Sequence, residues 1–89
     1  MMIKIIAIRA MGHQQLELGF SDGSSGAWSA AALIERDTVL TRPLTDPAYF
    51  AERAFIEGGA LAWPNGLEFS PAALHAELEA AGLLRQKAA

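Results

Sequence analysis

The local architecture of this chain is decided by one ten-residue stretch, AWPNGLEFSP at residues 62–71. Trp63 precedes a proline, which favours extended backbone at Trp63. Asn65-Gly66 supplies residues that tolerate the positive φ angles of a tight turn. Ser70-Pro71 has the residue types of a helix N-cap and a first helical position. The stretch therefore predicts a strand end, a turn and a helix start, and it contains no evident catalytic apparatus.

A helix is expected to follow this stretch. Phe69 and Leu74 are spaced for a hydrophobic staple around the helix start. Leu74 and Leu78 share one helix face, and Gly82 stands where a left-handed residue ends a helix. Residues 84–89 are then expected to be a frayed tail.

Strand patterns precede the stretch. Residues 3–8 are rich in β-branched side chains on both faces, which predicts an interior strand covered on each side. Apolar and polar residues alternate over 15–20 and Asp22-Gly23 follows, which predicts a hairpin over residues 15–28. Gly58-Gly59 lies between two short apolar runs and predicts a second hairpin.

Two short helical segments are expected in the middle of the chain. Ser29 can cap a helix over residues 30–34, and Asp46-Pro47 repeats the order of cap and proline. Residues 35–44 carry the weakest structural signal of the chain.

Together these elements predict an α+β fold. It has a small antiparallel or mixed sheet of four to five strands, a C-terminal helix packed on one face, and short helical turns in the middle connection. Residues 1–83 are expected to form a single α+β domain, with 84–89 as its tail. The predicted core consists of Ile5, Ile6, Ile8, Leu16, Leu18, Phe20, Trp28, Phe50, Phe55, Leu61, Trp63, Leu74 and Leu78.

Composition limits the classes of function. The 89 residues include no cysteine, which excludes disulfides and thiolate metal sites and makes a reducing, cytoplasmic location the expectation. The net charge of −3 argues against a nucleic-acid surface built on bulk charge. The apolar run at the N-terminus is interrupted by Lys4, closes at Arg9 and is too short to span a bilayer, so neither a signal peptide nor a membrane partner is expected.

Three motifs resemble those of the domain-of-unknown-function family 2442, a set of small, mostly bacterial proteins. They are the hairpin turn Phe20 to Gly23, the segment Pro43 to Asp46 with Phe50, and the stretch from Trp63 to Pro71. The resemblance implies an α+β fold with a small sheet and a terminal helix, and it supplies no established activity. Some relatives look like partners of small toxin-like proteins in paired operons, and some carry an appended DNA-binding domain.

The chain departs from that family at several positions. Ser29-Ala30-Ala31 replaces an Asp-Leu-Ser-like helix start, and Glu68 replaces the commoner Asp. Ala72 and His75 stand where Asp and Tyr are frequent in the family. A function that required those side chains would not carry over to this chain.

The residues with catalytic potential are few. A metal site would need His13 and His75 to converge with carboxylates such as Asp22, and their spacing matches no metal motif, so no metal or cofactor is expected. His75 is expected to lie on the helix surface, where it could pair with Glu79. Asp22 has the ordinary role of a turn residue.

The candidate ligand-binding residues lie in the stretch from 63 to 70. A turn next to a helix N-terminus can hold an anion, although a helix start already capped by Ser70 needs no ligand. Trp28 and Trp63 are expected in the core, with a partner-binding groove as the alternative. The candidate site consists of Trp63, Asn65, Gly66, Glu68 and Ser70.

No nucleophile elbow, phosphate loop or dinucleotide fingerprint is present in the sequence. The leading hypothesis is therefore a non-enzymatic interaction or regulatory, antitoxin-like module that binds another protein or a second copy of itself. Strand addition is a natural binding mode if Phe55 or Ile56 lies on an exposed edge. One alternative is a small-ligand or anion site at the Asn65–Ser70 turn, which a cleft joining a histidine to Asp22 or Glu68 would favour. A second is DNA binding, which requires the arginines at 36, 42 and 53 to share one face.

Overall fold

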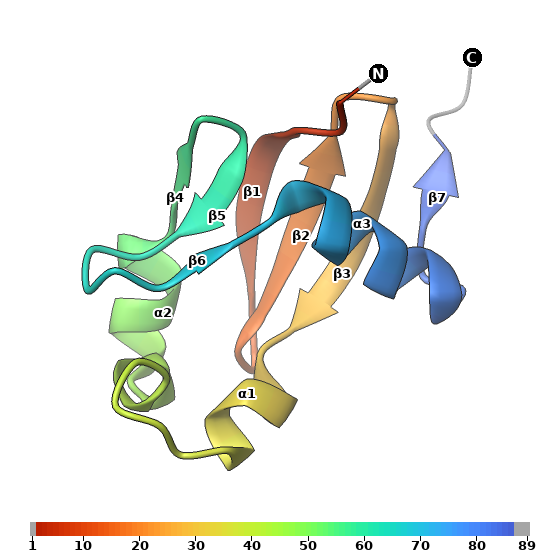
Figure 1. Cartoon of the computed structure of the whole chain (residues 1–89). Coiled ribbons are helices and arrows are strands. Elements are labelled where there is room, and N and C mark those ends of the chain that lie inside the picture. The colour runs from red at the N-terminus through yellow and green to blue at the C-terminus, as the bar shows by residue number, and fades with distance from the viewer. Residues whose placement is uncertain (1, 87–89) are drawn as a thin grey trace.

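Two small antiparallel sheets form the frame of the molecule, one of four strands and one of three. The α+β fold is as expected, but the strands are divided between two sheets instead of lying in one. The computed structural model describes residues 2–86 (Figure 1). The elements are β1 (Ile5–Gly12), β2 (Gln15–Phe20), β3 (Ser24–Ser29), α1 (Ala31–Glu35), the 3-10 helix η1 (Arg42–Thr45), α2 (Pro47–Arg53), β4 (Phe55–Glu57), β5 (Ala60–Ala62), β6 (Glu68–Phe69), α3 (Pro71–Ala80) and β7 (Arg85–Gln86).

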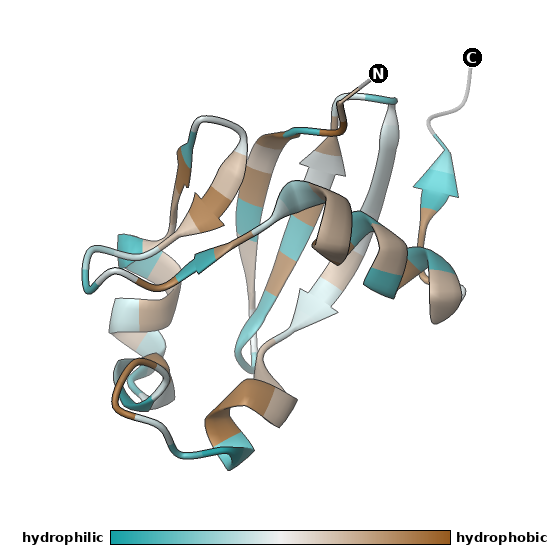
Figure 2. Ribbon diagram, viewed as in Figure 1, coloured by the Kyte–Doolittle hydropathy of each residue, from teal (hydrophilic) through white to brown (hydrophobic). Residues whose placement is uncertain are grey.

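The four-stranded sheet has the order β1-β2-β3-β7. Along β2, Leu16, Leu18 and Phe20 are buried, and the residues between them are only partly buried, as expected for opposite faces. Hydropathy accordingly changes from residue to residue along this strand (Figure 2). Leu16 faces Trp28 across the β2–β3 pair, so the apolar residues of both strands point into the same core. The hairpin predicted over residues 15–28 is confirmed.

The first strand differs from its prediction. Residues 3–8 were expected to form a strand covered on both faces, but β1 is the outer strand of its sheet and Ile6 is 64% exposed. Alternation along the strand turns Ile6 away from the buried Ile5. The register shift between Ile5 and Ala7 then brings the partly buried Ile8, opposite Leu18, back to the core face. The β-branched run reflects a bulged edge strand, and the prediction of Ile6 as a core residue is wrong.

The three-stranded sheet has the order β4-β5-β6 and contains the predicted second hairpin. The backbone N–H of Ile5 donates to the carbonyl of Gly59 at 2.8 Å, which ties the hairpin loop to the start of β1. Phe55 was expected in the core but is 39% exposed, because β4 is the outer strand of this sheet.

The helix α3 begins and ends as its sequence predicts. Ser70 Oγ accepts a hydrogen bond from the backbone N–H of Ala73, as an N-cap does. Gly82 has φ +72°, and the N–H of Leu83 donates to the carbonyl of Leu78 at 2.9 Å, which completes a Schellman closure. With ten residues, the longest helix described in residues 2–86 is too short to cross a lipid bilayer.

Two of the predicted segment ends are wrong. The N-cap of α1 is Ala30, since Ser29 lies at the end of β3, where its hydroxyl accepts from the N–H of Ala31. Residues 84–89 were expected to be a frayed tail, but Arg85 and Gln86 form β7 and pair with Ser25 and Ser24. The rest of that predicted tail, residues 87–89, lies outside the described residues.

The end of α3 lies directly against β3. An added Cβ at Gly26 would stand 2.8 Å from the carbonyl oxygen of Leu83, closer than real Cβ contacts come. The glycine therefore permits a close approach of two backbones at this point.

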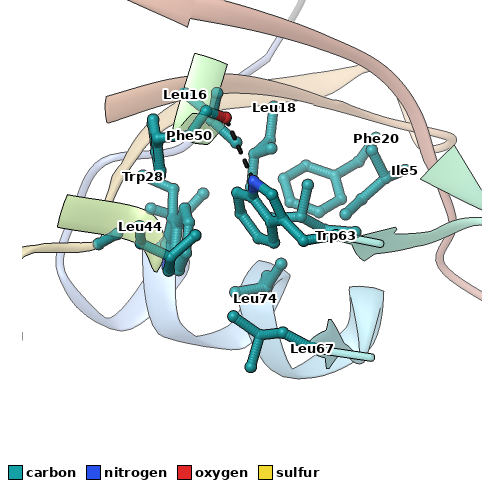
Figure 3. Close-up of a cluster of buried hydrophobic side chains, with 13 residues drawn as sticks. Ile5, Leu16, Leu18, Phe20, Trp28, Leu44, Phe50, Trp63, Leu67 and Leu74 are labelled. Atoms are coloured by element: carbon teal, nitrogen blue, oxygen red, sulfur yellow. Dashed lines mark hydrogen bonds between the residues drawn. The ribbon is translucent and has the colours of Figure 1, made fainter. Parts of the chain in front are cut away.

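The core lies between the two sheets and α3, with Trp63 near its centre (Figure 3). Leu44, from the segment with the weakest sequence signal, is fully buried beside it, and so is Ala30. The predicted core residues that are confirmed as buried are Ile5, Leu16, Leu18, Phe20, Trp28, Phe50, Leu61, Trp63, Leu74 and Leu78.

Candidate functional site

Trp63 belongs to the core and not to a surface groove. Its side chain is 1% exposed, and its indole N–H donates to the backbone carbonyl of Phe50 at 3.2 Å (Figure 3). Its ring lies against those of Trp28, Phe50 and Phe69, with centroid separations of 5.6 to 6.4 Å. The indole thus satisfies its one polar group inside the protein.

The turn after Trp63 is closed by its own hydrogen bonds. The Trp63 N–H donates to the Leu67 carbonyl, and the Gly66 N–H donates to the Trp63 carbonyl. The Asn65 amide accepts from the N–H of Leu67 at 3.3 Å and donates to the carbonyl of Leu40 at 3.0 Å. Asn65 therefore fastens the turn to the loop that precedes η1.

The remaining candidate residues extend along the chain from this turn. Glu68 is exposed in β6, where it pairs with Ala62, and Ser70 caps α3. The polar groups of Trp63, Asn65 and Ser70 are all engaged within the fold. Ligand binding by this stretch stays a prediction, and each of its residues other than Glu68 has a structural task.

A polar cluster joins α3 to the β2–β3 turn and brings together a histidine and Asp22, a pairing that the sequence analysis named only as a condition for the ligand-site alternative. His75 Nε2 lies 2.9 Å from Asp22 Oδ2, across 53 positions of sequence. The other oxygen, Asp22 Oδ1, accepts from the hydroxyl of the buried Ser24 at 2.6 Å and from its backbone N–H at 3.0 Å. We expected His75 to face Glu79, but its ring lies edge-on to Phe20 and reaches Asp22.

These contacts stabilise the ionised form of Asp22. The hydroxyl and then the backbone N–H of Ser24 lower its pKa from 3.8 to about 2, with a smaller contribution from His75 and a partial offset by desolvation. A turn carboxylate with two hydrogen bonds from its own loop needs no ligand to explain that shift. No sequence spacing signals the pair, because it depends on where α3 lies on the sheet.

The cluster contains the residue types of a hydrolase triad without its geometry. In such a triad the histidine removes the proton of the nucleophilic hydroxyl, whereas here the hydroxyl of Ser24 donates to Asp22. Ser24 is also 1% exposed, and its hydroxyl hydrogen is used in the bond to Asp22. The cluster joins helix and hairpin, and among residues 2–86 no group of three histidine or acidic side chains lies close enough to hold a metal ion.

Two hollows lie on either side of Trp28. The larger, of about 330 Å³, runs between β3 and the C-terminal half of α3 and includes Ser29, Glu77 and Leu83 in its lining. The smaller, of about 120 Å³, lies towards α1 and is bordered by Arg36. Glu77 Oε2 accepts a hydrogen bond from the Trp28 indole N–H at 2.9 Å between them.

The arginines named for DNA binding do not line a common hollow. Arg42 is ion-paired with Asp37 at 3.0 Å, and Arg53 lies on α2 beside Glu52. Arg36 borders the hollow beside Trp28. These contacts do not test whether the three side chains share one face, so DNA binding stays a prediction.

The sequence was compared with models of known protein families. The family model described as "Protein of unknown function (DUF2442)" matches residues 5–80. The chain belongs to the DUF2442 family. The match spans β1 to α3 and so includes the closed turn at Asn65, the aromatic core around Trp63 and the Asp22–His75 pair. No curated protein and no solved structure gives a significant match to this DUF2442 chain.

Proposed function

We propose that this DUF2442 protein is a non-enzymatic protein-interaction module. The observation that carries the proposal is the outer strand β4, in which Phe55 and Ile56 are 39% and 37% exposed. An edge strand presents backbone N–H and C=O groups that another chain can pair with, and exposed apolar side chains on it favour such pairing.

The polar residues of the candidate site support this reading. Asn65 and Ser70 use their polar groups to close a turn and to cap α3. Ser24, the hydroxyl nearest a histidine-aspartate pair, is buried and donates to the carboxylate. A module whose polar side chains serve its fold and whose edge strand is apolar is better suited to binding a protein than to chemistry.

The resemblance to the family also suggests where the protein acts and what kind of partner it binds. We place the protein in a bacterial cytoplasm, in a regulatory or antitoxin-like role, with a partner encoded beside it. The complete absence of cysteine is compatible with a reducing compartment.

The test is capture of the tagged full chain from its native host, followed by mass spectrometry of intact complexes. We expect one stoichiometric partner, and we expect Ile56→Lys to reduce its recovery at least fivefold by placing a charge on the edge. The matched control is Val39→Lys, which changes an exposed apolar residue in a loop remote from β4 in sequence.

The outcome that contradicts the proposal is recovery of the wild-type chain alone or only as a homodimer. That result would favour the small-ligand alternative at the Asn65–Ser70 turn. Thermal unfolding of each variant, followed by circular dichroism, establishes that lost capture does not reflect lost folding.

A further inference from the structure

The strand β3 is longer than the strand that covers its second edge. On one side it pairs with β2 from Ser25 to Ser29. On the other side β7 pairs only with Ser24 and Ser25. Within residues 2–86, no strand pairs with residues 27–29 on that edge, and Figure 1 shows this part of β3 extending past β7.

A groove runs beside this open edge. It has a volume of about 330 Å³, with Ala27 and Ser29 on the strand side and Leu78 and Ala81 on the helix side. The close approach of Leu83 to Gly26 separates the groove from β7. The open edge is therefore bordered by a hollow with apolar walls.

The charges around the groove favour a cation. Glu77 is the one charged residue in its lining. The last turn of α3 carries no basic residue, so the negative end of the helix dipole is not compensated there. The leucine and alanine walls suit the aliphatic stem of a lysine or arginine, whose charged end would lie near Glu77.

We propose that an extended segment of a partner protein adds as a strand to residues 27–29 and places a lysine or arginine against Glu77 and the C-terminal end of α3. This edge is separate from β4, so the inference rests on the proposed function and adds a second binding edge to the interaction module. It names the chemistry of what binds there: a basic segment with β propensity. A second copy of this chain is disfavoured as the occupant because each copy carries a net charge of −3.

The probe is a synthetic seven-residue peptide of alternating valine and threonine with one central lysine, added to the full chain. We expect it to shift the backbone amide resonances of Ala27, Trp28 and Ser29. A peptide with norleucine in place of lysine should bind about threefold to fivefold more weakly, the upper part of the range expected for loss of one exposed ion pair.

Two variants test the site without disturbing the core. Glu77→Gln keeps an acceptor for the Trp28 indole but removes the charge, so it should weaken the lysine peptide about threefold to fivefold. Ala81→Arg places a cation and a long side chain in the groove and should abolish binding while it favours the helix end. Glu79→Gln, on the same helix but outside the groove lining, is the matched control and should bind as the wild type does.

Several outcomes overturn the inference. The first is that the peptide shifts only resonances of other elements. The second is that Glu77→Gln and Glu79→Gln weaken binding of the lysine peptide equally. The third is self-association of the chain that Glu77→Gln abolishes, which would make a second copy the occupant. If the native partner is still captured in any of these cases, the proposed function stands and only this site is wrong. If no partner is captured and the peptide binds nowhere, both are wrong.

Discussion

Gly66 carries the left-handed backbone of the turn that follows Trp63, with φ +96°. No atom lies within 4 Å of the position that a Cβ would take there, so space does not restrict this residue. The restriction is conformational, since L side chains, and β-branched ones above all, rarely adopt this φ.

We therefore expect Gly66→Val to lower the free energy of unfolding by about 1–3 kcal/mol, the usual cost of a strained backbone conformation. Urea denaturation followed by circular dichroism measures it. Glu68→Val is the control, because it adds the same side chain to an exposed strand position. An unchanged midpoint for Gly66→Val would show that the turn accepts a side chain.

At the scale of elements, the Asp22–His75 contact joins α3 to the β2–β3 turn. Because the pKa of Asp22 is about 2 in the folded protein and 3.8 ordinarily, its ionised form contributes stability above about pH 4, and this contribution is lost as the pH falls towards 2. The stability difference between the wild type and Asp22→Asn should therefore shrink between pH 5 and pH 2, as acid and urea titrations would show.

Ser24→Ala separates the causes of that shift. It removes the hydroxyl that contributes most to lowering the pKa of Asp22, so the pKa should rise from about 2 towards 3.8 in a carboxyl NMR titration. His75→Gln should raise it less. An effect of His75→Gln larger than that of Ser24→Ala would contradict this order of causes.

The same scale shows which parts of the fold could be predicted from sequence. The β2–β3 hairpin and α3 were predictable because alternation, turn residues and caps act within a few positions. The η1 segment was not, since Leu44 is buried through contacts with distant elements and no local pattern marks it. The two-residue strand β7 depends on where α3 ends against β3.

The candidate site also has features that local sequence predicts and features that depend on long-range contacts. The turn at Asn65 and the cap at Ser70 follow from local residue types. The hydrogen bond from Asn65 to Leu40 and the pairing of His75 with Asp22 join positions 25 and 53 residues apart, so the chain must fold before either can be seen.

At the scale of the whole molecule, Trp63 joins the parts. It follows β5 of the three-stranded sheet, contacts Trp28 of the four-stranded sheet and donates to Phe50 of α2. An 89-residue chain typically has a total stability of about 4–13 kcal/mol, so one large core residue is a substantial share of it.

Trp63→Ala should therefore lower the free energy of unfolding by about 3–5 kcal/mol, a large share of the total. Val39→Ala, at a side chain that is 78% exposed, should change stability by less than about 0.5 kcal/mol. Guanidinium denaturation followed by circular dichroism measures the free energy of unfolding of both variants and of the wild type. A Trp63→Ala midpoint within error of the wild type would show that the two sheets do not depend on this residue.

The contact between Gly26 and Leu83 also has a consequence for evolution. A Cβ at position 26 would lie 2.8 Å from the Leu83 carbonyl oxygen and 3.3 Å from a Leu78 methyl group. With the end of α3 in this position, only glycine fits there. Any DUF2442 relative with a larger residue at the equivalent position must carry the segment after its last helix along another path. Its β3 edge would then be exposed over a different length without a change in the core.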